Sequence, residues 1–197
     1  MKTISLFPSI LAKHQLTSYS DNLLEVVKKQ SFSPSYNNNG GYSQDNVNIL
    51  DLKEFKHVKK EILKTAKDFI DNHLGHEVGK IKLSGSWANK LETNNLVPLH
   101  YHINSYVSGV IYLTKGTSVE FHTPVKPTPI FPMIKKFTKY TQPSYLVKPK
   151  KGLCVLFPAN FMHSVPCSQE KETRYSIGFN IIPVGKIGFP TANITLA

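Results

Sequence analysis

The sequence predicts an α+β protein that is mainly β, with a β-sandwich or barrel core behind a helical N-terminal region. Two observations predict this class. Residues 51–74 form an amphipathic helical stretch, and after Gly79 the chain breaks into short β-like runs separated by Gly, Pro or Asn. The 197 residues, of which 40% are hydrophobic, are enough for one sizeable core. We therefore expect a single domain, with helical support in residues 1–78 and the β core in residues 79–183.

The N-terminal region is predicted to be helical, with one long loop. Residues 21–30 begin on an acidic residue and end near lysines, which is the charge order of a short helix. Residues 31–48 are rich in Ser, Asn and Gly and predict a loop. Residues 51–74 carry apolar side chains every three to five positions, the stripe of an amphipathic helix. We expect Asp51 to cap this helix and Gly75 to end it.

Seven β-like runs follow Gly79. In chain order they read KIKLSGSWANKL, LHYHINS, VSGVIYLT, SVEFHT, SYLVKP, GLCVLFPA and RYSIGFNII. Between the fourth and the fifth run, residues 123–143 are rich in Pro and Lys, and proline argues against a central strand. We therefore predict a long loop there. Long loops inside a compact domain are often functional, so we expect this loop and the loop at residues 31–48 to border a substrate pocket.

The charge balance is basic, with a formal net charge of +11. Such a surface attracts nucleic acid and acidic partners. However, 23 of the 24 basic residues are Lys, and only Arg174 is Arg, the residue that usually reads bases and phosphates through bidentate contacts. A lysine-rich solvated surface is therefore the favoured interpretation. The substrate stays open between a small molecule, a protein and a nucleic acid, and the oligomeric state stays open too, a homodimer included.

The sequence indicates a cytoplasmic protein. No apolar run is long enough to span a membrane, so we expect no membrane partner. The first 16 residues lack the continuous apolar stretch of a signal peptide. Cys154 and Cys167 do not suggest a disulfide framework, and reduced thiols are the simpler interpretation.

The strongest functional signal is the stretch PLHYHINSYVSGVIYL, residues 98–113. In a strand, side chains at positions i and i+2 point to the same face, so His100 and His102 would project together, ~7 Å apart. Two imidazoles on one face can bind one metal ion. No Asp or Glu lies beside them, so a third ligand must come from elsewhere in the chain. The sequence position favours His163, in LFPANFMHSVP, which follows a β-like run and a turn.

The single arginine lies eleven positions after His163, in TRYSIGFN. Ser176 follows Arg174 by two positions and shares its face if the run is a strand. A guanidinium can hold a carboxylate by two hydrogen bonds, and a hydroxyl group adds a further donor. Arg174 and Ser176 therefore form a candidate site for a dicarboxylate cosubstrate.

Three segments taken together, HYHINSYVSGVIYL, LCVLFPANFMHSVP and ETRYSIGFN, resemble the 2-oxoglutarate/Fe(II)-dependent oxygenases. The similarity is closest to a small branch found in bacteria and phages that carries an H-x-H-x-x-S-x-x-S-G-x-x-Y-[LV] block, and GSWANKL also resembles that branch. The resemblance covers about residues 80–182. It implies a double-stranded β-helix (a jelly roll) with flanking N-terminal helices, and it implies Fe(II), 2-oxoglutarate and O₂. A phage-encoded member would act in the host cytoplasm.

The resemblance implies a role for each histidine. His100 matches the first metal ligand of the superfamily, and His163 matches the distal one. His102 stands where the superfamily has Asp or Glu, and a face of three imidazoles still suits Fe(II). A second arrangement takes His102 as the first ligand and Asn104 as the replaced acid. We favour His100, His102 and His163, because imidazole is a better ligand than a carboxamide.

The same resemblance makes Arg174 the cosubstrate arginine, with Ser176 beside it. It also suggests Tyr112 and Asn89 as further donors to 2-oxoglutarate. It implies a dioxygenase that hydroxylates an unreactive C–H bond of an unknown substrate and releases succinate and CO₂. The part played by the protein is then to bind, to orient and to exclude water.

Two other functions stay open. A cupin-like protein could hold a metal ion on three histidines without using 2-oxoglutarate, although the cupin motif normally has a Glu a few residues after H-x-H, and INSYVSG has none. A non-catalytic basic protein could instead bind nucleic acid. The first alternative predicts that Arg174 has no influence on 2-oxoglutarate binding, and the second predicts that the protein takes up no iron.

Overall fold

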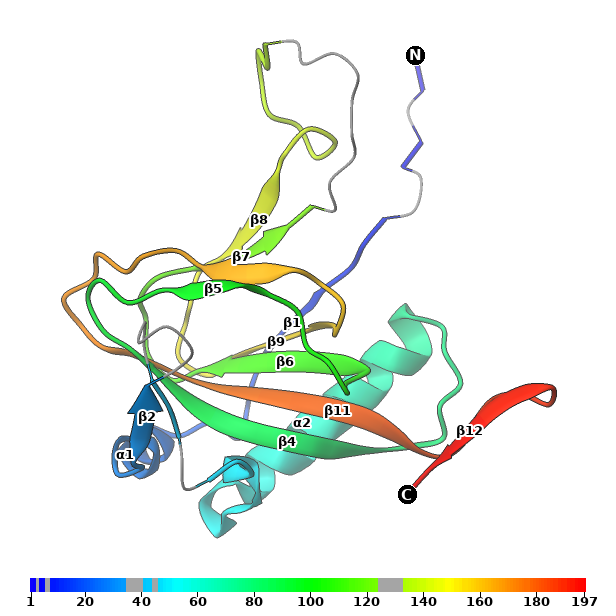
Figure 1. Cartoon of the computed structure of the whole chain (residues 1–197), viewed down its shortest axis with the longest axis horizontal. Helices are drawn as coiled ribbons and strands as arrows, with labels where there is room; N and C mark the ends of the chain where they lie inside the picture. Colours follow the sequence, from blue (N-terminus) through cyan, green and yellow to red (C-terminus); the bar gives the residue numbers. More distant parts are fainter. Residues whose placement is uncertain (3, 6–7, 35–40, 44–45, 124–132) are drawn as a thin grey trace.

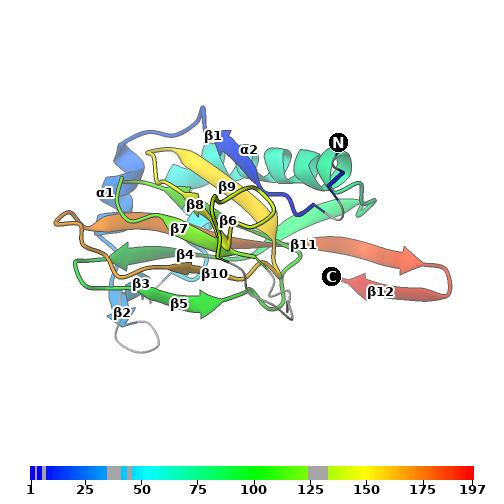
Figure 2. The same cartoon turned by 90° about the horizontal axis from the view of Figure 1, so that it is seen from above.

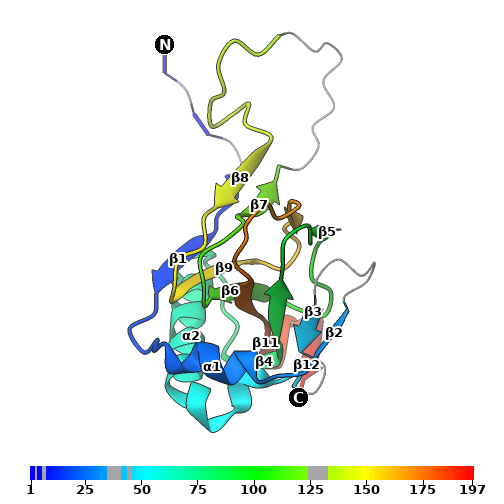
Figure 3. The ribbon, with the colours of Figure 1, turned by 90° about the vertical axis from the view of Figure 1, so that its left-hand side faces the viewer.

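Two β-sheets pack face to face, and the helices cover the outer side of the larger sheet (Figures 1 and 3). This arrangement comes from a computed structural model of the chain. The structure describes residues 1–2, 4–5, 8–34, 41–43, 46–123 and 133–197. The predicted α+β, mainly β class is confirmed, because strands form both layers of the central sandwich.

The larger sheet is built around β11, a 16-residue strand at Arg174–Phe189. Its strands follow the order β1-β9-β6-β11-β4-β3-β2, and β12 pairs with the far end of β11. The other bounds are β1 Ala12–Gln15, β2 Phe32–Pro34, β3 Gly41–Ser43, β4 Lys80–Leu91, β6 Val107–Tyr112, β9 Leu153–Pro158 and β12 Ala192–Leu196. The hairpin formed by β11 and β12 projects from the body of the molecule (Figure 2).

The smaller sheet holds β5, β10, β7 and β8 in that order, and all its pairs are antiparallel. These strands span Val97–His100, His163–Val165, Val119–His122 and Ser144–Val147, respectively. Each of the seven predicted β-like runs overlaps a strand, although only Leu99 and His100 of LHYHINS lie in β5, and β10 and β12 are additional. β10 is only three residues long, so no alternation of side chains reveals it, although the sequence does favour a strand start at His163.

Two short strands lie where the sequence predicts a loop. β2 and β3 form a hairpin within residues 31–48, and β3 pairs with β4 through Gly41↔Lys90 and Tyr42↔Asn89. The loop prediction is wrong for these strands. They are three residues each and rich in Ser, Pro and Gly, so no β pattern is visible, and the pairing partner lies far along the chain. Of the two predicted loops, residues 35–40, 44–45 and 124–132 lie outside the described residues.

The predicted helices are present, but the longer one begins later than expected. The helical segments are α1 Asn22–Lys28, η2 Ile49–Asp51, η3 Lys53–Phe55, α2 Lys56–Asp68 and the π-helical turn η4 Phe69–His73. Asp51 does not cap α2, because it lies in the 3-10 turn η2, which is separated from α2 by the extended residue Leu52 and by the second 3-10 turn η3. Asp51 forms an ion pair with Lys59 instead. Gly75 follows with a positive φ of 68°, and so ends the helical segment as predicted.

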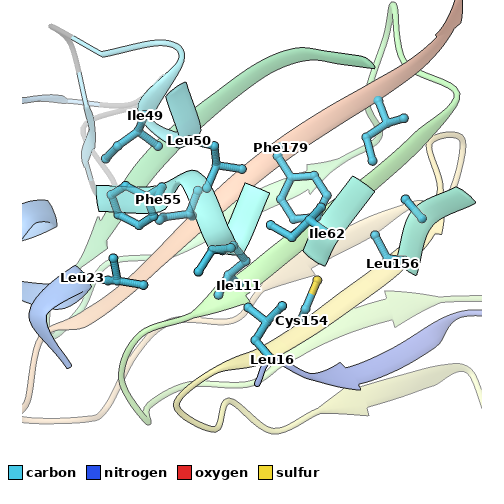
Figure 4. Packing of buried hydrophobic residues seen from close by; sticks show 14 of the residues in the cluster. Leu16, Leu23, Ile49, Leu50, Phe55, Ile62, Ile111, Cys154, Leu156 and Phe179 are labelled. Atoms are coloured by element: carbon cyan, nitrogen blue, oxygen red, sulfur yellow. The ribbon is translucent and has the colours of Figure 1, made fainter. Parts of the chain in front are cut away.

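The main core lies between α2 and the larger sheet (Figure 4). Ile62 of α2 belongs to the same buried cluster as Ile177 and Phe179 of β11. Gly109 on β6 makes this packing possible, since a Cβ atom there would lie 2.2 Å from the ring of Phe179. A second buried cluster fills the space between the two sheets, and both sheets contribute to it: Leu91, Tyr112, Val119, Phe121, Val147, Val155, Phe157 and Val165.

Side chains alternate between the two faces of a strand, so successive residues of β11 point alternately to the core under α2 and to the space between the two sheets. Ile177 and Phe179 point to the helices. Arg174, Ser176 and Asn180 occupy the alternate positions, on the face that looks toward the smaller sheet. One strand therefore carries part of the main core and part of the inner surface of the sandwich.

The chain on either side of the predicted β core also contributes to the larger sheet. β1, β2 and β3 precede residue 79 and join that sheet, and β11 continues past residue 183 to Phe189. The N-terminal support is therefore built from strands as well as helices. Within the described residues, no helix combines the length and the apolar character needed to cross a membrane.

Glu61 of α2 forms hydrogen bonds with the N-terminal segment. Its carboxylate accepts hydrogen bonds from the backbone N–H groups of Thr17 and Ser18, both at 2.9 Å, and from the Ser18 hydroxyl group. Its Oε1 also lies 2.7 Å from His14 Nε2. Burial by itself raises the pKa of Glu61, but the hydrogen bonds from Ser18, Thr17 and His14 outweigh it and lower the pKa to about 2.

We expect Glu61→Gln to lower the free energy of unfolding by about 1–3 kcal/mol at pH 7, because hydrogen bonds to a charged acceptor are lost. The folded-state pKa lies below the ordinary 4.5, so this stabilisation is complete above pH 4.5 and disappears as the pH falls toward 2. Urea unfolding of both proteins between pH 7 and pH 3 measures it. Glu54→Gln, at an exposed position, is the control. A pH-independent difference would contradict the prediction.

Candidate metal centre

Three histidines gather at one end of the space between the sheets. His100 ends β5 and His163 begins β10, and the two residues are direct partners in the antiparallel ladder. His102 lies two residues beyond β5. One ring nitrogen of each histidine lies within 4.8 Å of the others. The ring centroids are 4.2 Å apart for His100 and His163, 5.1 Å for His102 and His163, and 5.4 Å for His100 and His102.

The strand argument for the first two histidines is wrong in its detail. β5 stops at His100, so His102 is not on the same strand. The chain leaves the sheet there because the N–H group of His102 donates to the carbonyl of Ala159, in the turn before β10. Cross-strand pairing and this turn bring the histidines together, rather than a period of two along one strand. Asn104, the other candidate for the acid position, is exposed and has a φ of 53°.

Each imidazole places its Nδ1 atom against an oxygen acceptor. The contacts are His100 to the carbonyl of Pro98 at 2.8 Å, His102 to Asn180 Oδ1 at 2.6 Å, and His163 to the carbonyl of Phe161 at 2.8 Å. An oxygen acceptor requires the proton on Nδ1, so the lone pair of each ring is on Nε2. This is the arrangement that metal-binding histidines normally show.

Aromatic rings surround His102 and His163, and burial lowers the pKa of both imidazoles. The rings of Phe121 and Phe157 have centroids 5.6 Å and 4.9 Å from that of His163. Burial, with a smaller contribution from nearby His100, lowers the pKa of His163 to about 3. Burial also lowers the pKa of His102. At neutral pH both rings are therefore unprotonated, as metal ligation requires.

Arg174 lies deeper between the sheets, stacked on Tyr112. The guanidinium carbon is 5.2 Å from the centre of the Tyr112 ring, and the two residues are only 4% and 0% exposed. Within the described residues, Arg174 Nε and the Tyr112 hydroxyl group have no hydrogen-bond partner. Burial lowers the pKa of Arg174 and raises that of Tyr112 to about 12. Two buried, unpaired donors side by side fit a carboxylate.

The predicted cosubstrate residues lie in one row across three strands. Ser176 of β11 pairs with Asn89 of β4 on one side and with Tyr112 of β6 on the other. Residues directly opposite in a ladder share a face, so all three side chains are on the Arg174 side of the sheet. The structure therefore brings together the four residues that the resemblance selects for 2-oxoglutarate.

The sequence does not identify Asn180, although a signal for it exists. Arg174, Ser176, Gly178 and Asn180 follow a period of two, so they share one face of β11. Trp87 of β4 covers Gly178, because a Cβ atom at Gly178 would lie 2.9 Å from the indole ring. The Trp87 ring is 5.7 Å from that of His102, so it forms an aromatic wall between the two ends of this face.

Comparison with known proteins agrees with this geometry. A family model described as "Putative 2OG-Fe(II) oxygenase" matches residues 85–180. This segment contains the three histidines, Arg174 and Asn180. No curated protein matches the chain at a significant level. The family description names 2-oxoglutarate and Fe(II), which are the cosubstrate and metal expected from the sequence.

Solved structures share the fold. HygX from Streptomyces hygroscopicus, solved with nickel, 2-oxoglutarate and hygromycin B bound, is 11% identical with a TM-score of 0.63, and the match covers 89% of this chain and 83% of HygX. A Pseudomonas putida prolyl-4-hydroxylase is 12% identical with a TM-score of 0.61, covering 90% and 94%. A Burkholderia pseudomallei oxidoreductase of the 2OG-Fe(II) oxygenase family is 12% identical with a TM-score of 0.58, covering 87% and 83%.

These likenesses confirm the predicted double-stranded β-helix. The family match covers the strands that carry the histidine cluster and the buried arginine. Residues 85–180 match the 2-oxoglutarate/Fe(II)-dependent oxygenase family, and the chain as a whole shares the fold of these oxygenases.

Proposed function

We propose that this oxygenase binds Fe(II) on His100, His102 and His163 and hydroxylates an unidentified substrate with release of succinate and CO₂. One observation carries the proposal: three imidazoles present nitrogen atoms within 4.8 Å of one another. Imidazole suits Fe(II), and three ligands leave positions for a cosubstrate and for O₂. The set contains no carboxylate, so the protein adds no negative charge to the metal.

The chain's residues supply the cosubstrate site. We assign the far carboxylate of 2-oxoglutarate to the Arg174 guanidinium, with the Ser176 hydroxyl group beside it. Tyr112 and Asn89 are the further donors, from the neighbouring strands. The unpaired Arg174 Nε and Tyr112 hydroxyl group support this assignment, since each would gain an acceptor. Iron, 2-oxoglutarate and O₂ supply the oxidising power, and the protein supplies orientation and a dry site lined by Phe121 and Phe157.

The test is 2-oxoglutarate turnover by metal-free protein reloaded with Fe(II). We expect succinate to form only when Fe(II), 2-oxoglutarate and O₂ are all present. Metal uptake without any affinity for 2-oxoglutarate would instead support a cupin-like three-histidine protein. Failure to take up metal, together with salt-sensitive DNA binding, would support a non-catalytic basic protein.

We also propose that the substrate is an acidic polymer that docks on the projecting arm between β7 and β8. This arm, residues 123–143, contains four Lys and no Asp or Glu. In the described part of the arm, Lys135, Lys136 and Lys139 are exposed, and Phe137 is 61% exposed among them. The described part of the arm, residues 133–143, extends away from the two sheets (Figure 1). Lysines interspersed with an exposed aromatic ring suit a polyanion.

Reversing the charge of the arm should weaken such binding. We expect Lys135→Glu/Lys136→Glu/Lys139→Glu to reduce the affinity for a single-stranded oligonucleotide or for poly-glutamate, and the wild-type affinity to fall steeply with salt. Fluorescence anisotropy measures both. The control is the same change at three exposed lysines around the start of α2: Lys53, Lys56 and Lys60. Equal losses in the two variants would show that only overall charge matters.

The compartment and the oligomeric state stay predictions. Cys154 and Cys167 are both free, the first buried and the second exposed, which supports our proposal of a reducing, cytoplasmic location. Size-exclusion chromatography with light scattering distinguishes a monomer from the homodimer that the sequence leaves open.

A further inference from the structure

We propose that Asn180 is the positioning residue that aims His102 at the metal, an inference that rests on the metal site proposed above. Asn180 Oδ1 accepts a hydrogen bond from His102 Nδ1 at 2.6 Å. This bond keeps the proton on Nδ1 and leaves the lone pair of Nε2 toward His100 and His163. Asn180 itself does not belong to the ligand set.

His102 needs such a partner more than the other two histidines do. His100 and His163 lie in strands, and each is held by the backbone carbonyl of the residue two positions before it. His102 lies beyond the end of β5, and its ring is held by a side chain instead. Of the three supports, only the one from Asn180 can therefore be removed by a substitution that leaves the backbone intact.

Ser108 fixes the orientation of the Asn180 amide, and Ser105 lies next to Ser108 and donates to the carbonyl of Val107. Ser108 Oγ donates to the same Oδ1 atom at 2.8 Å, so the amide presents oxygen rather than nitrogen to His102. Ser105 Oγ lies 3.0 Å from Ser108 Oγ and extends the network. Both serines belong to the H-x-H-x-x-S-x-x-S-G block of the sequence. The network thus gives these two positions of the block a role that metal ligation alone does not.

Backbone pairing on both sides of Asn180 places its amide beside the ring of His102. Asn180 lies directly opposite Ser108 of β6, and residues directly opposite in a ladder share a face, so the amide lies beside the Ser108 hydroxyl group. The carbonyl of Ile181 then accepts a hydrogen bond from the N–H group of Tyr106 at 2.9 Å. The loop that carries His102 is therefore fastened to β11 beside Asn180.

An amide also suits the charge of this site. Its oxygen accepts from Nδ1 without adding a negative charge to the three-histidine cluster. A carboxylate at the same place would accept the same hydrogen bond and strengthen it by charge. A side chain without an acceptor would leave the imidazole free to turn or to change tautomer. Loss of such a partner typically weakens metal affinity ~10–100-fold.

The test compares Asn180→Leu with Asn180→Asp in metal-free protein. Co(II) titration followed by absorption gives the metal affinity, and long-range ¹H–¹⁵N spectra of the imidazoles give the tautomer of His102. We expect Asn180→Leu to bind Co(II) ~10–100-fold more weakly and to lose the Nδ1–H form. Asn180→Asp should restore both. Asn193→Leu, the same change in exposed β12, should have no effect on either readout.

Each other outcome has a distinct meaning. If Asn180→Leu keeps the wild-type affinity and tautomer, Asn180 does not position His102. If the wild-type protein binds no Co(II), the proposed metal site fails, and the tautomer in metal-free protein still decides the role of Asn180. If Asn180→Leu does not fold, Ser108→Ala serves instead, because it leaves Asn180 but frees its amide to turn. An unchanged His102 tautomer and Co(II) affinity in Ser108→Ala would then overturn the proposal.

Discussion

Replacing His163 by alanine is expected to remove metal binding and succinate formation together. His163 is 7% exposed and lies within 4.8 Å of both other candidate ligands, so no described side chain can take its place without moving a strand. Loss of a ligand should exceed the ~10–100-fold loss in affinity that follows removal of a ligand's hydrogen-bond partner. Co(II) titration and a succinate assay measure the two effects on the same preparation.

His122→Ala is the matched control for this prediction. His122 lies on β7, next to β10, and its Nε2 atom is 2.8 Å from Ser164 Oγ. It is not part of the three-histidine cluster. We expect this variant to keep both metal binding and turnover. Full turnover by His163→Ala would show that the ligand assignment is wrong.

Arg174→Met is expected to abolish the affinity for 2-oxoglutarate while leaving the metal affinity unchanged. Truncating one partner of a buried, hydrogen-bonded charge pair costs about 2–5 kcal/mol, which corresponds to at least a ~30-fold rise in the dissociation constant. Calorimetric titration of the metal-loaded protein with 2-oxoglutarate measures it. Unchanged affinity would favour the cupin-like alternative, in which the metal site works without this cosubstrate.

The same substitution should not destabilise the ligand-free protein. Arg174 is 4% exposed, and no carboxylate among the described residues forms an ion pair with it. Burying an unpaired cation is unfavourable, so methionine should leave the free energy of unfolding equal or higher. Urea unfolding without ligand tests this. A large loss of stability would mean that Arg174 holds the fold rather than a ligand.

Local patterns made the main strands predictable. All seven predicted β-like runs overlap a strand, because alternating side chains and turn residues occur within each run, but LHYHINS shares only its first two residues with β5. Arg174 and Ser176 share a face for the same reason. The proximity of His163 to His100 followed from the resemblance and the chain order, and the structure shows its physical basis in the pairing of β5 with β10.

Features that depend on distant partners could not be predicted. β2 and β3 exist because β4 completes their ladder. His102 reaches the cluster from outside β5 because Ala159 accepts its N–H group, 57 positions along the chain. Asn180 supports His102 from 78 positions away. The period of two along β11 indicates the face on which Asn180 lies but not its partner, since each of these contacts joins segments that only the folded topology brings together.

Because side chains alternate between the two faces of β11, insertions and deletions in this part of the gene should be tolerated less well than substitutions. Between Arg174 and Asn180, every second residue faces the site and the residues between them, Ile177 and Phe179 included, face α2. A substitution alters one face at one point. A single-codon insertion or deletion would instead exchange the two faces for every residue beyond it, so that core side chains would enter the site and polar ones the core. We therefore expect homologous genes to differ by substitutions in these seven codons but to keep their number constant.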